Sequence, residues 1–431
     1  MTSKVKGQGN GRDGVESQLR LFSGPRGRRL SVAGLFAGIG GFELGFSRAG
    51  HRTELLCEIE PGAQAVLQAR FPDIPLHGDI GTLDRLPRGL DALLAGFPCQ
   101  DLSQAGKTAG ITGSRSGLVG HVFRLLQRER VPVVILENVP FMLQLARGQA
   151  LEHIVGELER LGYRWAYRVV DSRAFGLPQR RERVYFVATL QGDPRAILFA
   201  DEAGGPIEPT YSRRLARGFY WTEGVRGLGW AVDAVPTLKG GSTIGIPSPP
   251  AIVMPNGDVV KPDIRDAERM QGFEVDWTAP TASVTRESHR WKLVGNAVSV
   301  EAAEWLGRRL ALPGEYSPDS DVPLAAGAPW PKAAWGSQDE GRFRAAVSAW
   351  PERRHRAPLH RFLAFPPQLL SVKATTGFLS RARSPECTLR FPEGFLEDLD
   401  AHLERVKAKE NAQVRQAAKA RSKVGLAGAR P

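Results

Sequence analysis

Cysteine is scarce in this chain of 431 residues, where it occurs three times, at Cys57, Cys99 and Cys387. The three positions have no spacing typical of a metal site, and so few cysteines cannot form a disulfide framework in a chain of this length. The sequence therefore predicts no bound metal and a reducing compartment.

Long apolar runs are also missing. The segment 131–136 is typical of the longest ones, which is far below the ~20 residues of a membrane-spanning helix. The N-terminus is polar and glycine-rich and has no apolar signal core. We expect no membrane association and a cytoplasmic location.

Acidic residues are outnumbered: 46 Asp and Glu stand against 58 Lys and Arg, which gives a formal net charge of +12. Such an excess suits a polyanionic partner, because lysine and arginine displace counterions from phosphates. Many proteins with this balance bind no nucleic acid, so the charge alone decides little. The length allows one large core and a second lobe.

Strand-like and helix-like segments alternate in the N-terminal half. Helical patterns at 62–71 and 149–161 separate several of the apolar runs. This alternation predicts an α/β fold with a mostly parallel sheet. Because the last two runs lie close together, we expect the sheet to end in an antiparallel pair. The predicted strands are 31–36, 53–57, 92–97, 131–136, 165–170 and 184–190.

Changes in composition along the chain predict five segments. Glycine and proline are frequent in the segment 191–262, which is typical of short strands and loops. The last one ends in a charged, helix-like stretch at 394–423. The expected segments are a flexible basic arm at 1–29, the first part of the α/β domain at 30–190, a small lobe at 191–262, the returning part of the domain at 263–312, and a C-terminal extension without an assigned role at 313–431.

A glycine-rich loop follows the first predicted strand, at residues 35–42. Glycines at this point let a ligand approach the backbone at a helix N-terminus. Glu43 stands where the dinucleotide fingerprint needs its third glycine, which disfavours a pyrophosphate cofactor.

Acidic residues followed by isoleucine come next at two predicted strand ends or loops. Glu58 follows Gly41 by 17 residues, close to the ~20 expected for an acid that binds ribose hydroxyls. Ile59 offers a flat apolar contact for adenine, and Asp79 with Ile80 repeats the pattern. Taken singly, such acids are usually solvated. As a series they indicate an adenosine-bearing cofactor, and S-adenosylmethionine fits.

Cys99 lies in the segment Gly-Phe-Pro-Cys-Gln-Asp-Leu, directly after a predicted strand. Ligands bind at this rim of α/β sheets, so its thiol is a candidate nucleophile. Small residues between 103 and 117 are typical of a lid. The alternative, a buried structural cysteine, is the interpretation that we favour for Cys57 and Cys387.

Two further charged groups are expected at the same rim. Glu137 ends the strand 131–136, where a partly desolvated carboxyl could stay protonated and donate a hydrogen bond. Arg183 begins the strand 184–190 and reaches this rim if that strand is antiparallel to its neighbours. A capping glutamate and a surface charge run are the simpler alternatives.

Together these residues resemble the DNA cytosine-5 methyltransferase family. The combination of Pro-Cys-Gln, Glu-Asn-Val and Gln-Arg-Arg-Glu-Arg in this order is very specific. The matching blocks follow the family's order over about residues 31–310. They are 35–46, 58–59, 78–80, 96–107, 137–139, 179–184, 265–273 and 295–298.

The resemblance implies a class I S-adenosylmethionine-dependent methyltransferase: a Rossmann-like, mostly parallel sheet with an inserted target-recognition lobe. By the family mechanism, Cys99 attacks C6 of a flipped cytosine while Glu137 hydrogen-bonds N3 and the amino group. Arg183 and Arg181 hold the base, and C5 takes the methyl group.

The resemblance also implies a cofactor site. Ile59 replaces a frequent aromatic residue, and the lid sequence at 115–117 departs from the common pattern. The cofactor residues carried over are Phe36, Gly38, Ile39, Gly41, Glu58, Ile59, Asp79, Ile80, Pro98, Leu118, Asn296 and Val298.

Double-stranded DNA is the implied partner, with a restriction endonuclease as a possible functional counterpart. For any one candidate contact, an ordinary solvated side chain is about as plausible, and the recognised bases do not follow from the sequence. The candidate DNA contacts are Ser103, Arg115, Arg213, Arg214, Thr237 and Lys239.

Two other functions compete with this one. A tRNA-acting relative would share the catalytic set, but the Cys-Phe-Thr element of that branch is missing. A non-catalytic DNA-binding protein on the same scaffold is disfavoured, because Cys99, Glu137 and Arg183 are all present.

Overall fold

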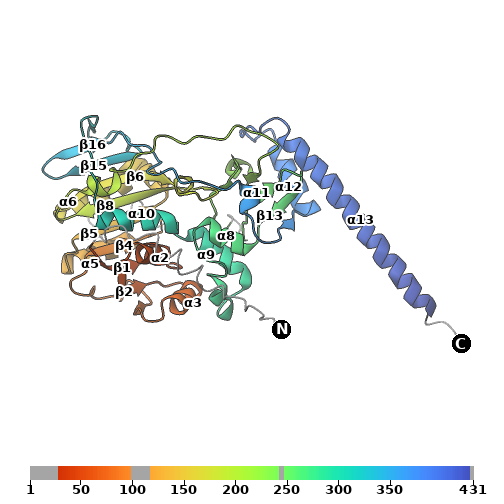
Figure 1. Ribbon diagram of the computed structural model, residues 1–431, viewed down its shortest axis with the longest axis horizontal. Coiled ribbons are helices and arrows are strands. Elements are labelled where there is room, and N and C mark those ends of the chain that lie inside the picture. The colour runs from red at the N-terminus through yellow and green to blue at the C-terminus, as the bar shows by residue number, and fades with distance from the viewer. Residues whose placement is uncertain (1–27, 99–116, 242–246, 428–431) are drawn as a thin grey trace, which may run out of the picture.

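The computed structural model describes residues 28–98, 117–241 and 247–427, with side chains up to residue 416. The molecule is elongated (Figure 1): a large α/β part lies beside a smaller lobe, and a long helix projects from the lobe. The predicted lid lies almost entirely outside the described residues, as does nearly all of the predicted N-terminal arm.

The large part is built on a ten-stranded sheet of order β14-β16-β15-β6-β8-β5-β4-β1-β2-β3. Neighbours among β1 to β5 are parallel, whereas β8 runs antiparallel to both β5 and β6. The strands are β1 (Ser31–Leu35), β2 (Arg52–Cys57), β3 (Leu76–His77), β4 (Ala92–Ala95), β5 (Val133–Asn138), β6 (Arg164–Asp171), β8 (Glu182–Thr189), β14 (Val322–Pro323), β15 (Ala333–Ser337) and β16 (Gly341–Arg344).

The predicted mixed sheet is therefore confirmed: it is parallel over β1 to β5 and contains the expected antiparallel pair, β6 with β8. The expectation that the sheet ends at this pair is wrong. Strand β15 pairs antiparallel with β6, and it covers an edge that would otherwise expose unpaired backbone groups. The sequence of β15, Ala-Ala-Trp-Gly-Ser, contains few of the β-branched residues that mark strands.

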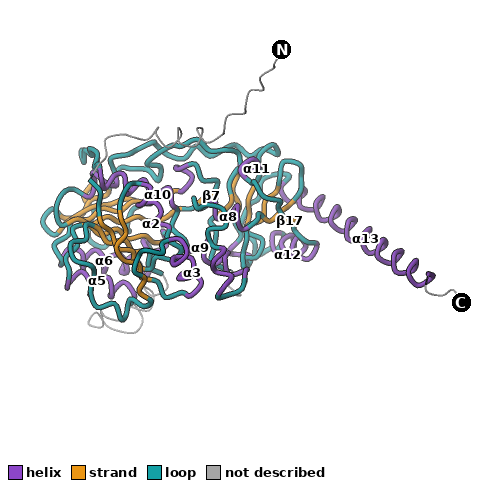
Figure 2. Tube along the Cα trace, turned by 60° about the horizontal axis from the view of Figure 1, so that its bottom comes forward, coloured by secondary structure: helices purple, strands orange, loops and turns teal. Residues whose placement is uncertain are grey.

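Helices cover both faces of this sheet (Figure 2). In β1, Val32 packs into one core and Ala33 into the other, as the two-residue period of a strand requires. On one side lie α2 (Gly41–Arg48), α7 (Pro194–Leu198) and α10 (Val300–Ala311). On the other side lie α5 (Leu118–Arg128) and α6 (Gln149–Arg160).

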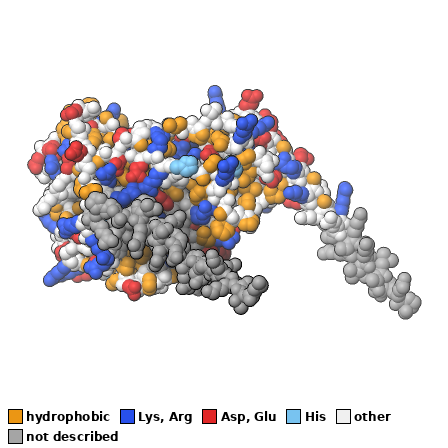
Figure 3. Space-filling view, viewed as in Figure 1, with side chains coloured by type: hydrophobic (Ala, Val, Ile, Leu, Met, Phe, Trp, Pro, Cys, Tyr) orange, Lys and Arg blue, Asp and Glu red, His pale blue; other side chains and the backbone are white. Residues whose placement is uncertain are grey.

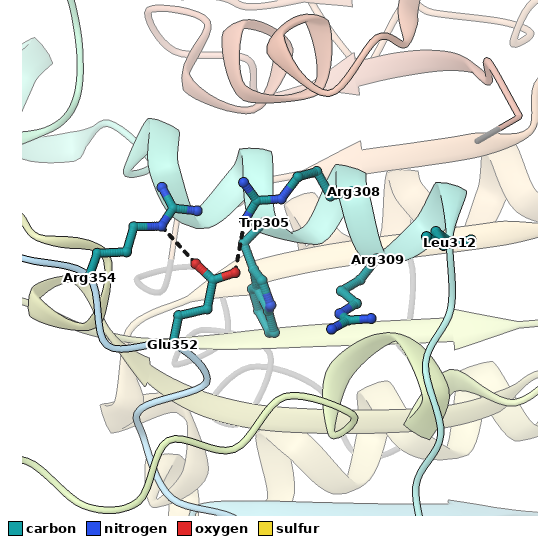
Figure 4. A pocket seen from close by; sticks show the side chains of 6 residues that line it. All are labelled: Trp305, Arg308, Arg309, Leu312, Glu352 and Arg354. Atoms are coloured by element: carbon teal, nitrogen blue, oxygen red, sulfur yellow. Dashed lines mark hydrogen bonds and ion pairs between the residues drawn. The ribbon is translucent and has the colours of Figure 1, made fainter. Parts of the chain in front are cut away.

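Ion pairs connect α10 to the C-terminal extension. Figure 4 shows Glu352 between two arginines, 2.8 Å from Arg308 and 2.7 Å from Arg354. Arg309, which lines the same pocket, is paired with Asp201. Because an acid balances each of these arginines, the pocket is best explained as a structural junction.

The lobe contains a five-stranded antiparallel sheet of order β10-β9-β12-β13-β17. Its last strand and its two helices come from the C-terminal extension. Phe219 and Val259 pack there against Phe378 and Phe395. The elements are β9 (Arg217–Phe219), β10 (Trp230–Val232), β12 (Ala251–Val253), β13 (Val259–Lys261), β17 (Gln368–Leu369), α12 (Val372–Ala382) and α13 (Phe395–Ala427).

Short elements join the two parts. Strand β7 (Gln179–Arg180) pairs in parallel with β11 (Val235–Pro236), so the segment before β8 contacts the chain of the lobe. The remaining helices are α3 (Pro61–Arg70), α8 (Ile264–Met270), α9 (Arg290–Asn296) and α11 (Leu359–Phe362), together with the 3-10 turns η1 (Pro140–Leu143), η2 (Leu145–Gly148), η3 (Ser172–Phe175), η4 (Val225–Gly227), η5 (Ala279–Ser283) and η6 (Glu287–His289).

The predicted terminal helix at 394–423 is confirmed as α13. Of the helices that the structure describes, none is long and apolar enough to cross a membrane.

Candidate active site

The candidate site lies at one edge of the large sheet. The carboxyl ends of the parallel strands β1, β2, β4 and β5 meet there, and β8 begins there because it runs the other way. This edge collects Phe36, Glu58, Pro98, Glu137 and Arg183. Three expected site residues, Cys99, Ser103 and Arg115, lie outside the described residues.

Glu137 and Arg183 form a buried ion pair at this edge. Arg183 Nε lies 3.1 Å from Glu137 Oε1, and the two side chains are 11% and 9% exposed. Burial raises the pKa of Glu137 above its usual value, against the lowering effect of Arg183 and Arg181. The carboxyl is therefore easier to protonate than a solvated one. The expected proximity of these two residues is confirmed.

The chain that leads to Cys99 is fixed beside this pair. Asn138 Nδ2 donates to the carbonyl of Phe97 at 3.0 Å, and Asn138 Oδ1 accepts from Val139 N–H at 2.8 Å. A Cβ added to Gly96 would lie 3.7 Å from Glu137 Oε2. The last turn described before position 99 is thus held next to the carboxyl group.

The glycine loop after β1 has an unusual backbone. Phe36 has a φ of 54°, a left-handed conformation that costs about 1 kcal/mol or more for a residue with a side chain. A Cβ on Gly41 would lie 2.4 Å from the carbonyl oxygen of Val298, so only glycine fits there. Trp277 Nε1 donates to the Ile39 carbonyl at 2.8 Å. Such a strained, close-packed loop is typical of a ligand site.

Open space lies in front of this loop, since a Cβ on Gly38 would meet no atom within 4 Å. Glu58 stands beside it and accepts hydrogen bonds from the N–H groups of Gly38, at 2.7 Å, and of Ile59, at 3.0 Å. Burial raises the pKa of Glu58 although these donors oppose the shift.

The two isoleucines expected beside adenine differ in exposure. Ile59 is 67% exposed next to Glu58, whereas Ile80 is 5% exposed and packs in the core. Asp79 accepts from Gly81 N–H at 2.8 Å. Of the other expected cofactor residues, Asn296 and Pro98 are exposed and Leu118 is half-buried.

Arg181 lies in a buried polar network. Its guanidinium donates to three carbonyls: Leu238 at 3.2 Å, Gly295 at 3.1 Å and Ala297 at 2.6 Å. Burial lowers its pKa to about 9. The two arginines of one motif therefore have different surroundings, one beside the carboxylate and the other among backbone oxygens.

Gln179 and Gln271 extend this network. Gln179 accepts from Leu238 N–H at 2.8 Å and donates to the Met270 carbonyl at 3.0 Å. Gln271 donates to Val294 O at 2.8 Å, and Ser299 donates to Gln271 at 3.1 Å. The network links the start of β8 to residues 238, 270 and 294–299.

Sequence reasoning passed over Gln271 and Ser299, although Gln271 lies inside the matched block 265–273. It also used Glu43 only to reject a dinucleotide site. Glu43 is 1% exposed and fills the space beside Gly34, where a Cβ would lie 1.8 Å from its carboxyl oxygen. Burial raises the pKa of Glu43 to about 8.

The candidate DNA contacts separate into two groups. Thr237 donates to the Arg180 carbonyl at 2.8 Å, and Lys239 lies 3.9 Å from the ring centre of Tyr220. Both belong to the segment that passes the buried network. Arg213 instead lies at the base of α13, 3.2 Å from Asp398, and is 64% exposed. Arg214 is exposed as well.

Cys57 is buried, and burial raises its pKa to about 12, which is expected of an unreactive structural cysteine. Cys387 is half-buried. Within 28–98, 117–241 and 247–427, no three His, Cys, Asp or Glu side chains are grouped to hold a metal ion.

The chain matches known methyltransferases. The model of the C-5 cytosine-specific DNA methylase family matches residues 30–214. The Type II methyltransferase M2.BsuMI of Bacillus subtilis is 45% identical over 386 residues, which cover 86% of this chain and 97% of that protein. M.BanI of Aneurinibacillus aneurinilyticus is 38% identical over 39% of this chain and 41% of its own length.

Among solved structures, the S. pombe Dnmt2 methyltransferase is 18% identical, with a TM-score of 0.48 over 66% of this chain and 98% of that one. Because the Bacillus relative is matched over nearly its whole length, the chain belongs to the C-5 cytosine-specific DNA methylase family. The predicted methyltransferase fold is confirmed.

We expect Arg181→Lys to lower the free energy of unfolding by about 2–4 kcal/mol, because a lysine cannot replace three directed contacts and leaves buried carbonyls unpaired. Urea unfolding followed by circular dichroism measures the change. Arg180→Lys, at the exposed neighbouring position, is the matched control and should change stability by less than about 0.5 kcal/mol. Equal stability of the two variants would contradict the structural role.

Glu43 should make stability depend on pH. Its pKa in the folded state, about 8, lies above the unfolded value, so its contribution is complete at low pH and is lost as pH rises through 8. Glu43→Gln removes this dependence, and its stability relative to wild type should rise by a few kcal/mol between pH 5 and pH 9. Urea unfolding at several pH values tests this. Glu274→Gln, at an exposed position, is the control and should keep the wild-type difference in stability between pH 5 and pH 9. If the free energies of unfolding of Glu43→Gln and wild type change with pH in parallel, the role assigned to Glu43 is wrong.

Proposed function

We propose that this protein transfers a methyl group from S-adenosyl-L-methionine to C5 of a flipped-out cytosine in a specific duplex DNA sequence, through a covalent bond between Cys99 and C6 of the base. The buried pair of Glu137 and Arg183 carries this proposal. In a chain of this family, it supplies a protonatable carboxyl beside the turn that precedes Cys99.

In the proposed reaction, the Cys99 thiolate adds to C6 of the cytosine, and the ring electrons move toward N3. Glu137, in its protonated form, donates to N3 and stabilises this charge. Arg183 orients the carboxyl and contacts the base. The glycine loop and Glu58 would hold S-adenosylmethionine, which would supply an electrophilic methyl group and leave as S-adenosylhomocysteine. C5, which the addition of Cys99 has made nucleophilic, takes this methyl group. Transfer of the C5 proton to a water molecule, with return of the N3 proton to Glu137, then expels the Cys99 thiolate and restores the aromatic ring.

Arg181 has a different proposed task. Its three carbonyl contacts fix the segments that carry Lys239 and Asn296 against the start of β8. We assign it to positioning the edge of the site. It does not contact the base in this assignment, and the expected direct contact stays with Arg183.

The glycine loop and Glu58 fit an adenosine-bearing methyl donor. Gly38 faces open space, Glu58 can accept from ribose hydroxyls after exchanging its backbone partners, and Ile59 offers an exposed apolar surface. The proposed cofactor residues are Phe36, Gly38, Ile39, Gly41, Glu58, Ile59, Asp79, Ile80, Pro98, Leu118, Asn296 and Val298.

The names of the relatives M2.BsuMI and M.BanI describe Type II methyltransferases. We propose the same role here: methylation that protects host DNA from a cognate restriction endonuclease, in the cytoplasm where that DNA lies. We also propose the expected segment 191–262 as the target-recognition part of the chain, in the lobe that it forms together with β17, α12 and α13. Methylome sequencing of a methylation-free host that expresses this gene would report the base, the polymer and the site. An absence of 5-methylcytosine in DNA despite expression would contradict the proposal.

Covalent catalysis predicts a trapped adduct. Duplex DNA with 5-fluorocytosine at the target should form a denaturation-resistant complex, because fluorine blocks the loss of the C5 proton. Cys99→Ala should abolish the adduct and methyl transfer while binding S-adenosylmethionine normally. Glu137→Gln should slow methyl transfer by about 10²–10⁴-fold, since general acid catalysis contributes about this much. A Cys99→Ala enzyme with near wild-type turnover would refute the mechanism.

The ribose role of Glu58 predicts a binding defect. Glu58→Ala should raise the dissociation constant for S-adenosylmethionine by about 10–100-fold, because hydrogen bonds to a charged group contribute about 1.5–3 kcal/mol. Isothermal titration calorimetry measures this. Glu54→Ala, on the same strand, is the control and should leave the constant unchanged. Equal affinities for the two variants would remove Glu58 from the site.

A further inference from the structure

The start of helix α13 is held by the lobe. Phe395 and Leu399 are fully buried in the lobe core. His402, also fully buried, accepts from Val259 N–H at 3.1 Å and lies 2.9 Å from the Leu370 carbonyl. Val406 is the last buried residue among the side chains that the structure describes, and those from Lys407 to Gln416 are all exposed. Beyond this point the helix extends away from the body, as Figure 1 shows.

The acidic and basic residues of helix α13 lie in different parts of it. Its first ten residues contain four acids and no Lys or Arg. Two of these acids contact lobe arginines: Asp398 lies 2.9 Å from Arg217 and 3.2 Å from Arg213, and Asp400 pairs with Arg383. The acidic start is therefore largely neutralised by the lobe to which it is attached.

The rest of the helix is strongly basic. Residues 405–427 contain seven Lys or Arg and a single acid, Glu410. We call 407–427 the projecting arm. Apart from alanine and glycine, its apolar residues are Val414, Val424 and Leu426, too few for the continuous seam of a coiled coil. Alanine, lysine, arginine and glutamine are good helix formers, so the sequence supports a helix without a packing partner.

We propose that the projecting arm binds the phosphate backbone of duplex DNA next to the sequence read by the lobe. The inference rests on the proposed function, in which duplex DNA is the substrate. The arm has 21 residues and spans about 30 Å at 1.5 Å per residue, close to one turn of duplex DNA at ~34 Å. Its charge complements phosphates, and among its described side chains, 407–416, Val414 is the one large apolar residue. Basic side chains also lie over the lobe on the face drawn in Figure 3.

Contact of this kind adds affinity without sequence preference. Each neutralised phosphate releases counterions and contributes about 0.9 to the slope of log Kd against log salt concentration. An arm that contacts three or four phosphates should therefore account for about 3 of that slope.

The test compares three proteins and one control on one probe. The three are the full chain, a chain that ends at Val406, and a full-length variant in which all six basic residues of the arm are replaced by glutamine: Lys407, Lys409, Arg415, Lys419, Arg421 and Lys423. The last variant keeps helix-forming residues and removes the positive charge. Gln413→Ala with Gln416→Ala is the control on the same arm. Fluorescence anisotropy gives Kd for a labelled 40-base-pair duplex from 50 to 200 mM KCl.

Both altered chains should bind this duplex at least about tenfold more weakly at 100 mM KCl, with a slope smaller by about 3. The control should match the full chain, and S-adenosylmethionine should bind all four proteins equally. An unchanged slope in the glutamine variant overturns the proposal. So does a larger loss on single-stranded RNA of equal length, or an arm-dependent dimer seen by sedimentation with an unchanged slope.

Failure of the proposed function has a different signature. If the full chain does not methylate plasmid DNA from a methylation-free host, the catalytic assignment fails, whatever the salt slopes show. If it methylates that DNA and the altered chains bind the 40-base-pair duplex with the same slope, only the role of the arm fails.

Discussion

The reversal of strand β8 is the constraint on which the site depends. A parallel strand would end where β5 ends and would place Arg183 at the far edge of the sheet. Because β8 runs antiparallel, Glu137 faces Tyr185 and Asn138 faces Val184 in the register, and Arg183 reaches the carboxyl group at 3.1 Å. The positive charge of Arg183 lowers the free-energy cost of burying the Glu137 carboxylate. The desolvation of Glu137 raises its pKa, so that the carboxyl group is more readily protonated. Acid catalysis at this edge would need both conditions.

Much of this edge could be predicted from the sequence. The strands before residue 190 are apolar runs separated by helical patterns, so their order and the collection of Glu58, Glu137 and Arg183 at one edge follow from simple topology. Local signals were sufficient because each of these residues directly ends or begins its strand.

The remaining features depend on contacts between distant segments. Nothing near Arg181 distinguishes it from Arg183, and only the carbonyls of Leu238, Gly295 and Ala297 direct it into the interior. The strand β15 is similar, because its small residues become a strand only when the exposed edge of β6 is available to them. The burial of Glu43 likewise arises from Gly34, a residue of another element.

The C-terminal extension belongs to both halves of the molecule. It adds β15 to the large sheet, and then β17, α12 and α13 to the lobe. The lobe is therefore assembled from two stretches of chain that are separated by more than a hundred residues in the sequence. Under the proposed role of the lobe in target recognition, exchanging a single continuous insert between two such proteins would leave the grafted sheet without an edge strand and without the part of its core that the C-terminal stretch supplies. A working chimera has to carry both stretches together.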